Sequence, residues 1–252
     1  MPQSAYYALG PVAREMLRHY ARGEMYTWLN QTDGERGWIA ASHRGVLMMP
    51  TLHIGHTVKK CLARKEFEFR YNTAFETVVE HCGDLGREGK TWITVELGAA
   101  YLELHRQGFA YSCEAWKNDV LVGGVFGVQI GGFVSIDSMF HVANNAGKAV
   151  LGHHAINLQQ RGFLFADVNY ASEHTRRFGA EWVPQWQFEK MMRPALHSGL
   201  SMIEGAAAPM LPWHVLMAEK SLRVIRSVGL RLTRSFSREL QTAGIGGEAI
   251  AA

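Results

Sequence analysis

The stretch that decides the fold is FAYSCEAWKNDVLVGGVFGVQIGGFVSIDSM, residues 109–139. It holds three apolar segments, 109–116, 120–130 and 133–139, and the first alternates as a half-buried strand does. A Lys-Asn-Asp turn and a glycine pair separate them. Short turns between apolar segments are typical of antiparallel hairpins. The stretch therefore predicts a three-stranded antiparallel meander.

Helical patterns lie on both sides of this meander. Thr94 is a favourable N-cap for a helix over 95–107, and a second helix is expected over 146–161. A strand at 163–168 and a short helix after Tyr170 follow. This order predicts an α+β (mixed α/β) fold, with a GNAT-like acyltransferase core in which helices flank a mainly antiparallel sheet.

The chain is expected to have three regions. A polar, glycine-rich segment at 83–90 marks the end of a small N-terminal α/β lobe over residues 1–88. Residues 89–194 form the catalytic domain, and residues 195–252 form a helical extension with a disordered tail. Within the extension, the basic residues of 220–238 fall on one side of a helical wheel, which predicts a basic amphipathic helix.

Composition narrows the class of protein. The 252 residues carry a net charge of +3, and 47% of them are hydrophobic, which is typical of a globular chain. The three cysteines, Cys61, Cys82 and Cys113, form no CxxC pair or metal-ligand spacing. No secretion signal or membrane-spanning run is apparent. We expect a cytoplasmic protein without a metal; the oligomeric state is not predicted.

Charge is unevenly distributed along the chain. Residues 36–65 hold six Lys or Arg and no acid, and residues 220–238 hold another six. Segregated basic stretches suggest a polyanionic partner, either nucleic acid or an acidic membrane surface. Solvated helix faces give the same pattern, so the charge alone leaves these alternatives open.

An ordinary acetyl-CoA enzyme is disfavoured. Such enzymes hold the pyrophosphate with backbone N–H groups of a glycine-rich loop at a helix N-terminus. The equivalent strand-to-helix junction, residues 140–148, has one glycine and bulky residues where the backbone should approach a phosphate.

The same junction carries a family resemblance. SMFHVANNAGKAVL, residues 138–151, resembles the S-M-F-S-x-x-x-x-A-S-K-x-A-L signature of leucyl/phenylalanyl-tRNA–protein transferases. Further matches are Thr91-Trp92-Ile93-Thr94, the L-H-x-x-G-x-A-x-S-x-E-x-W pattern over 104–116, Leu121-Val122-Gly123-Gly124, Asp167-Val168-Asn169 in place of D-C-Q, and His174 with Phe178-Gly179-Ala180. The resemblance spans about residues 15–192 and is specific over 91–184.

This resemblance implies a reaction and its partners. Members transfer an amino acid, such as Leu or Phe, from aminoacyl-tRNA to the α-amino group of a protein N-terminus. Aminoacyl-tRNA is a co-substrate, and no cofactor is implied. Two alternatives stay open: a tRNA-dependent enzyme that aminoacylates a peptide or small amine in a biosynthetic pathway, and a non-catalytic tRNA- or membrane-binding protein.

The resemblance also implies catalytic residues. Asp167 and Asn169 lie two apart on the predicted strand, so both side chains should share one face. The Asn169 carbonyl can orient the attacking amine, while Asp167 holds the amide. Asp137, expected on the adjacent strand, suits a cationic acceptor. The alternative is that these residues are polar strand-end caps.

Binding residues follow in the same way. The implied adenosine site of the aminoacyl-tRNA consists of Trp28, Trp92 and Tyr20, with the two tryptophans stacked on adenine. The implied amino-acid pocket consists of Met139, Phe140, Leu151 and His154. A predicted helix over 54–65 offers Lys59, Lys60, Arg64 and Lys65 to tRNA phosphates.

Several departures from the family pattern fall at these positions. Asp137 and Asn169 replace Glu and Gln, and each side chain is one methylene shorter. His154 replaces an aromatic residue and is expected to recognise something polar. Of the W-W-S-P-D-P-R element only Trp38 and Arg44 are kept. The chemistry is thus predicted to be kept, with a changed acceptor or amino acid.

Overall fold

The computed structural model describes residues 4–30, 34–84, 91–203, 205–212 and 214–216. The predicted basic helix over 220–238, the predicted tail and most of the predicted boundary segment lie outside these residues.

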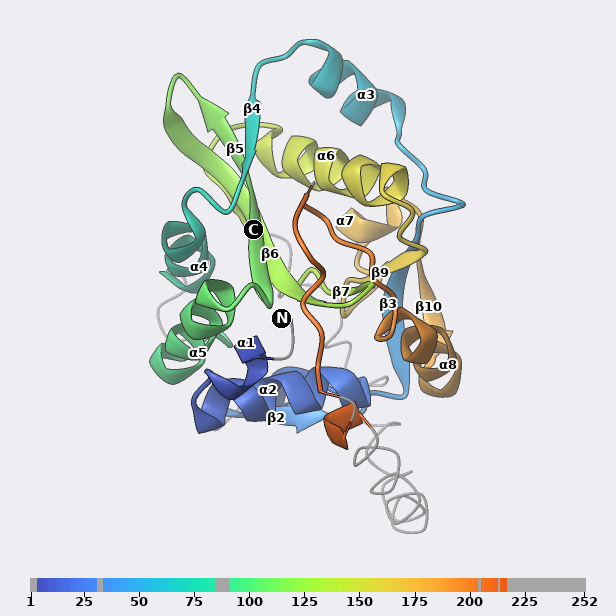
Figure 1. Cartoon of the computed structure of the whole chain (residues 1–252). Helices are drawn as coiled ribbons and strands as arrows, with labels where there is room; N and C mark the ends of the chain where they lie inside the picture. Colours follow the sequence, from blue (N-terminus) through green and yellow to red (C-terminus); the bar gives the residue numbers. More distant parts are fainter. Residues whose placement is uncertain (1–3, 31–33, 85–90, 204, 213, 217–252) are drawn as a thin grey trace.

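The described part of the chain is a mixed α/β fold with antiparallel sheets (Figure 1). Its helices are α1 (Ser4–Tyr7), α2 (Pro11–Arg22), α3 (His56–Ala63), α4 (Phe75–Asp84), α5 (Val95–Arg106), α6 (Ala146–Gln160), α7 (Glu173–Arg176) and α8 (Gln185–Ala195). Its strands are β1 (Met25–Asn30), β2 (Glu35–Ile39), β3 (His43–Met48), β4 (Glu68–Tyr71), β5 (Ala110–Lys117), β6 (Val120–Ile130), β7 (Phe133–Val134), β8 (Ser138–His141), β9 (Phe165–Asp167) and β10 (Ala180–Pro184).

The largest sheet has the order β4-β5-β6-β7, and β8 also pairs with β6. The antiparallel β5–β6–β8 arrangement confirms the predicted meander, but its third strand is split into β7 and β8. Between them, Ser135 N and Asp137 N still donate to β6, but the pairing register shifts by one residue. Gly127 allows this close approach, because a Cβ there would overlap the carbonyl of Ser135. Ser135 then bridges to Asp167, and Asp137 lies between the two short strands rather than within one.

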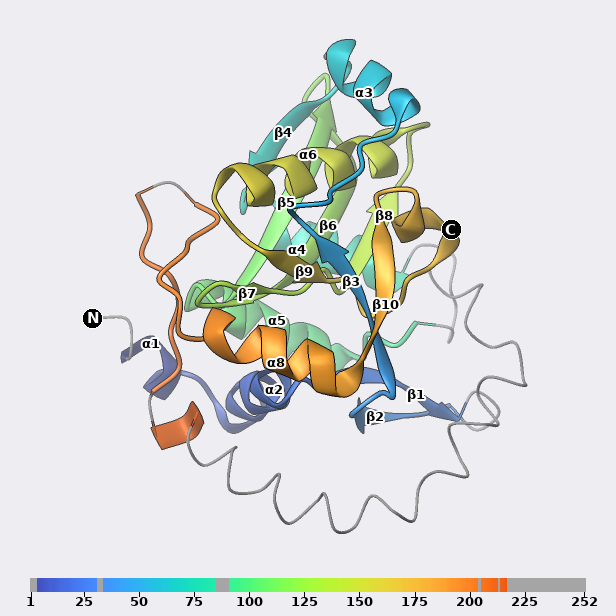
Figure 2. The same ribbon diagram turned by 90° about the vertical axis from the view of Figure 1, so that its right-hand side faces the viewer.

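A second sheet has the order β10-β3-β9, with β3 in the middle (Figure 2). The strand predicted at 163–168 is shorter in the structure and ends at Asp167. Strand β10 and helix α8, which the sequence patterns did not predict, complete this side of the molecule. Strands β1 and β2 form a separate antiparallel hairpin.

Helices cover both faces of the large sheet. Helices α4 and α5 pack on one face and α6 on the other (Figure 1). The predicted Thr94 cap is confirmed, since its side chain accepts a hydrogen bond from Leu97 N at 3.1 Å. Two hydrophobic clusters fill these layers, and both draw residues from either side of the predicted boundary at 88–89. The predicted lobes therefore share their cores.

Candidate active site

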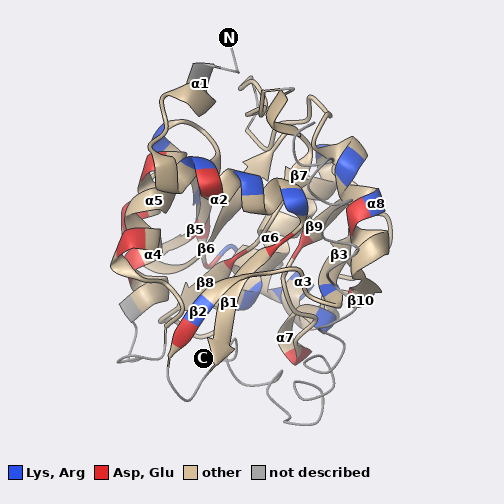
Figure 3. Cartoon of the chain, turned by 90° about the horizontal axis from the view of Figure 1, so that it is seen from below, with Lys and Arg blue, Asp and Glu red and all other residues tan. Residues whose placement is uncertain are grey.

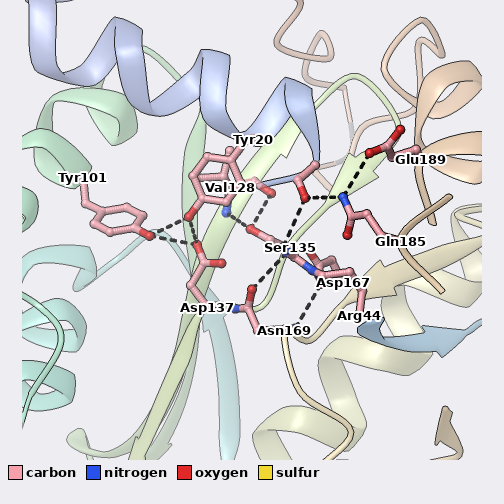
Figure 4. Close-up of polar contacts among 11 residues, drawn as sticks. Tyr20, Arg44, Tyr101, Val128, Ser135, Asp137, Asp167, Asn169, Gln185 and Glu189 are labelled. Atoms are coloured by element: carbon pink, nitrogen blue, oxygen red, sulfur yellow. Dashed lines mark hydrogen bonds and ion pairs between the residues drawn. The ribbon is translucent and has the colours of Figure 1, made fainter. Parts of the chain in front are cut away.

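A buried arginine organises the polar centre of the molecule (Figure 4). Arg44 and Asp167 are both fully buried and form an ion pair through Nη2 and Oδ2, with a second bond from Nε to Oδ1 at 3.3 Å. Nη2 also donates to Oδ1 of Asn169 at 3.1 Å, and Nη1 donates to the carbonyl of Gly23 at 3.3 Å. Burial of this charge is possible because the guanidinium is paired and hydrogen-bonded.

The backbone around Asn169 depends on Gly45, the residue after Arg44. Gly45 N donates to the Asn169 carbonyl at 2.9 Å. A Cβ on Gly45 would overlap the backbone of Tyr170 and Ala171, so only glycine lets this segment cross β3. Asn169 has a φ of 58°, a left-handed conformation that asparagine tolerates better than most residues.

The predicted reason for the proximity of Asp167 and Asn169 was wrong. The strand ends at Asp167, and the left-handed Asn169 does not continue its alternation. Two other contacts hold the pair together: Asn169 N donates to Asp167 Oδ1 at 2.9 Å, and Arg44 bonds both side chains. Sequence reasoning did not place Arg44 in the site. The sequence feature that could have indicated a buried role for Arg44 is that it is a single charged residue at the start of an otherwise apolar strand.

Asp137 forms a second polar group beside the first. Tyr20 from α2 donates to its Oδ2 at 2.6 Å, and Tyr101 from α5 donates to the same oxygen at 3.1 Å. Burial raises the pKa of both tyrosines, so both hydroxyls keep their protons. Loss of solvation raises the pKa of Asp137 to about 6, helped by the charge of Asp167 and opposed by the tyrosine hydrogen bonds. Asp137 also follows directly after Ile136, whose N donates to the Asp167 carbonyl at 2.7 Å, so the two acidic residues belong to neighbouring segments.

Aromatic side chains pack against the two tyrosines that bond Asp137. The Trp92 ring lies 6.4 Å from Tyr101 and 6.3 Å from Tyr26 on β1. Trp38, which was not assigned to the site, makes edge contacts with Tyr20 at 5.3 Å and with Tyr26 at 5.4 Å. Tyr20, assigned to adenosine, instead commits its hydroxyl to the Asp137 group.

Trp28 occupies the same face of the β1–β2 hairpin as Tyr26. It pairs across the strands with Arg36, whose guanidinium lies 4.0 Å from the centre of the indole. Because side chains two apart on a strand share a face, Trp28 and Tyr26 both point to the side from which Trp92 approaches. No ring contact joins Trp28 to Trp92 in the described residues.

The four residues assigned to the amino-acid pocket do not lie together. Leu151 belongs to the hydrophobic cluster on the α6 side of the sheet, and the partly buried Met139 packs against it. His154 bonds Tyr111, a member of the same cluster. Phe140 points to the opposite face, where its ring stacks on His81 of α4 at 4.6 Å. Neighbouring residues on a strand face opposite ways, so grouping Phe140 with Met139 was wrong.

His154 is fully buried and has no free ring nitrogen. Tyr111 donates to the Ser135 carbonyl at 2.6 Å and accepts from Nε2 of His154, which lies 3.0 Å away. The other nitrogen, Nδ1, therefore accepts from the Tyr71 hydroxyl at 3.1 Å. Burial, with a smaller effect of His153, lowers the pKa of His154 to about 3. The expectation that His154 recognises a polar ligand is therefore wrong in this arrangement.

The basic stretch over 36–65 divides into two kinds of residue. Lys59, Lys60, Arg64 and Lys65 are exposed on or just after α3, and this helix contains no acid. By contrast, α2 and α8 carry both signs of charge (Figure 3). Arg44 is buried and Arg36 stacks on Trp28, so neither belongs to the exposed basic face.

A comparison with known families accounts for this arrangement. A profile described as "Leucyl/phenylalanyl-tRNA protein transferase" matches residues 46–193, more than half of the chain. The chain belongs to this family. The matched region contains helix α3 and the site residues Trp92, Tyr101, Asp137, Asp167 and Asn169. Arg44 and the aromatic residues of α2, β1 and β2 precede it.

Individual family members agree with the profile. The leucyl/phenylalanyl-tRNA–protein transferase of Myxococcus xanthus strain DK1622 is 38% identical over 198 residues, covering 77% of this chain and 84% of that protein. The Salinibacter ruber member is 36% identical, covering 72% and 78%, and the Chlorobium limicola member is 31% identical, covering 75% and 97%. These matches confirm the resemblance inferred from the motifs.

Other features of this family member lie apart from the polar centre. An open hollow of about 550 Å³ at the end of α6 contains none of the predicted site residues. It is lined by Asn157, Gln160, Arg161, Gly199, Leu200, Ser201, Ile203, Gly205 and Ala206. Within the described part of the chain, no cluster of His, Cys, Asp and Glu could hold a metal ion. No described helix is long and apolar enough to cross a bilayer.

Proposed function

We propose that this protein transfers an amino acid from aminoacyl-tRNA to the α-amino group of a protein N-terminus, in the cytoplasm where charged tRNA is made. One observation carries the proposal: the Arg44–Asp167–Asn169 centre and the Asp137 carboxylate adjoin an aromatic group that contains Trp92. Polar groups that could promote amide-bond formation thus lie beside aromatic surfaces on which a nucleoside could stack.

The reaction needs few groups, because the ester of aminoacyl-tRNA is already activated. The amine nitrogen attacks the carbonyl carbon, a C–N bond forms, and the C–O bond to the ribose breaks. The proton lost by the amine goes to the ribose oxygen, through water or a side chain. Residues must hold both substrates and stabilise charge on the carbonyl oxygen. We assign Asp137 to the acceptor, because a carboxylate of raised pKa can attract an ammonium or take its proton.

The tRNA would contact two regions of the surface. Trp92 and Trp28 are proposed to stack on the terminal adenine, each base stack contributing about 1–3 kcal/mol. Phosphates of the acceptor stem would contact the exposed cations of Lys59, Lys60, Arg64 and Lys65. Such contacts need exposed positive charge but do not read the base sequence. Met139 and Leu151 are proposed to border the aminoacyl side chain. A GNAT-type core is part of the same proposal.

A second candidate is transfer to a peptide or small amine. It is favoured by the two shortened side chains, Asp137 and Asn169, which leave more room between the carboxylate and the amide than Glu and Gln would.

A transfer assay distinguishes the candidates. Total tRNA charged with one radiolabelled amino acid at a time is mixed with the protein and a peptide that begins with Arg or Lys. Label in the peptide from Leu-, Phe- or Met-tRNA supports the first candidate, with an N-acetylated peptide as the control that must stay unlabelled. Tight binding of tRNA without labelled peptide supports the second, and absence of tRNA binding contradicts both.

A further inference from the structure

The contact between Arg44 and Asn169 fixes which way the asparagine amide faces. A guanidinium has only donors, so the Asn169 atom that lies 3.1 Å from Arg44 Nη2 must be the carbonyl oxygen. Rotating the amide by 180° would set an NH₂ group against a cationic donor. The amide nitrogen therefore points away from Arg44, and Figure 4 shows it on the side of Asp137.

The rest of Asn169 is held equally firmly. Its backbone N–H donates to Asp167 Oδ1 at 2.9 Å, and its carbonyl accepts from Gly45 N at 2.9 Å. The side chain is half-buried, and its Nδ2 makes no hydrogen bond to another residue in the described part of the chain. Two N–H donors are thus held in place by the protein and left for a ligand.

We propose that Asn169 acts as a hydrogen-bond donor to the ester carbonyl oxygen of aminoacyl-tRNA, and that Arg44 is the positioning residue that holds the amide in this orientation. This inference rests on the proposed aminoacyl transfer. It replaces the sequence-based hypothesis that the Asn169 carbonyl orients the attacking amine.

Electrostatics favour the donor role. As the C–N bond forms, an electron pair of the carbonyl bond moves onto oxygen, and it returns when the C–O bond to the ribose breaks. A fixed N–H group beside that oxygen stabilises the charge during this interval. Arg44 strengthens the donor because a cation that bonds the amide oxygen polarises the amide. The same cation makes the amide oxygen a poor partner for an incoming ammonium.

The decisive variant is Asn169→Asp. It keeps an oxygen for Arg44 but removes both N–H groups, so the two roles predict opposite results. The donor role predicts that kcat falls by about 10²- to 10³-fold, while KM for aminoacyl-tRNA changes by less than about two-fold. The carbonyl role predicts an unchanged or higher kcat, because a carboxylate accepts hydrogen bonds better than an amide.

Arg44→Lys tests the positioning role. Lysine keeps the charge beside Asp167, but its single ammonium lacks the planar fork that reaches Asp167 and Asn169 together. We expect kcat to fall at least about 10-fold with KM little changed. In an Asn169→Ala background, Arg44→Lys should lower kcat no further, because Arg44 acts on the reaction through Asn169. A purely structural role would lower kcat equally in both backgrounds.

The outcomes separate the inference from the proposed function. If the wild-type protein forms no product with any charged tRNA or acceptor, both fail. If the wild-type protein is active and Asn169→Asp keeps kcat within about three-fold, the donor role alone is overturned. Thermal unfolding of each variant identifies any kcat loss caused by misfolding, and the Arg44→Lys comparison is then made on the folded variants.

Discussion

The hydroxyl of Tyr20 lies 2.6 Å from Oδ2 of Asp137, although 117 residues separate the two in the chain. Tyr101 donates to the same oxygen, so two helices, α2 and α5, deliver one hydroxyl each to a single carboxylate. These bonds favour the ionised form, whereas burial and Asp167 disfavour it, and the balance is a pKa of about 6.

Activity should therefore rise with pH through about 6, as Asp137 ionises. The Asp137→Asn variant should lack this part of the pH profile and lose most of its kcat. Tyr20→Phe removes a hydrogen bond that lowers the pKa, so its midpoint should move to higher pH. Initial rates from pH 5 to 8 measure these changes. A rise through pH 6 that persists in Asp137→Asn would show that another group is responsible.

The same pKa predicts a change in stability. Because the folded pKa of Asp137 is raised from 3.8 to about 6, its stabilising effect is complete below pH 4 and is lost as pH rises through 6. Relative to wild type, Asp137→Asn should gain up to about 3 kcal/mol of unfolding free energy between pH 4 and 7. Urea unfolding at these pH values tests the difference, and an unchanging difference would contradict the assigned pKa.

His154 predicts the opposite dependence on pH. Its folded pKa of about 3 lies below the usual 6.5, so unfolding takes up a proton below pH 6.5 and stability falls with falling pH. This slope should approach about 1.4 kcal/mol per pH unit between pH 6 and 5. His154→Phe should flatten it, whereas substitution of the exposed His56 by Gln should not. Equal slopes in all three proteins would mean that His154 is not held neutral.

Gly45→Ala should displace the Asn169 segment. Its Cβ would overlap the backbone of Tyr170 and Ala171, so the segment must move away from β3. We expect a loss of roughly 1–3 kcal/mol in stability and a kcat at least about 100-fold lower. Gly199→Ala is the matched control, because a Cβ there meets no atom within 4 Å. Normal kcat in Gly45→Ala would argue against a fixed position for Asn169.

Removal of charge from α3 should weaken tRNA binding without affecting the fold. Lys59 and Lys60 are exposed, so their joint replacement by Ala should leave the Tm unchanged. If each contacts a phosphate, the slope of log affinity against log salt should become shallower by about 1 per lysine. The exposed Lys190 on α8, a helix that lies well below α3 in Figure 1, provides the control variant Lys190→Ala. If the Lys59/Lys60 double variant has the same salt slope as the wild type, the tRNA does not bind at α3.

Several helices and strands could be predicted from short sequence patterns. The antiparallel β5–β6 pair follows from alternation around a polar turn, and α5 follows from its Thr94 cap. The split between β7 and β8 could not be predicted, because it depends on a register shift against β6 and on the close approach of Gly127 and Ser135. By contrast, strand alternation alone would have predicted that the side chains of Met139 and Phe140 point to opposite faces of the sheet, as they do.

By itself, the sequence determined the family and pointed to Asp137, Asp167 and Asn169. Motifs that occur in a fixed order along the chain can be recognised without knowing which residues are in contact. Only the tertiary structure decided what these residues do to one another. Arg44 looks in sequence like one more member of a basic stretch, yet the pairing of β3 with β9 buries it against a carboxylate 123 residues away. A buried charge requires a partner, and strand pairing rather than sequence distance supplies it.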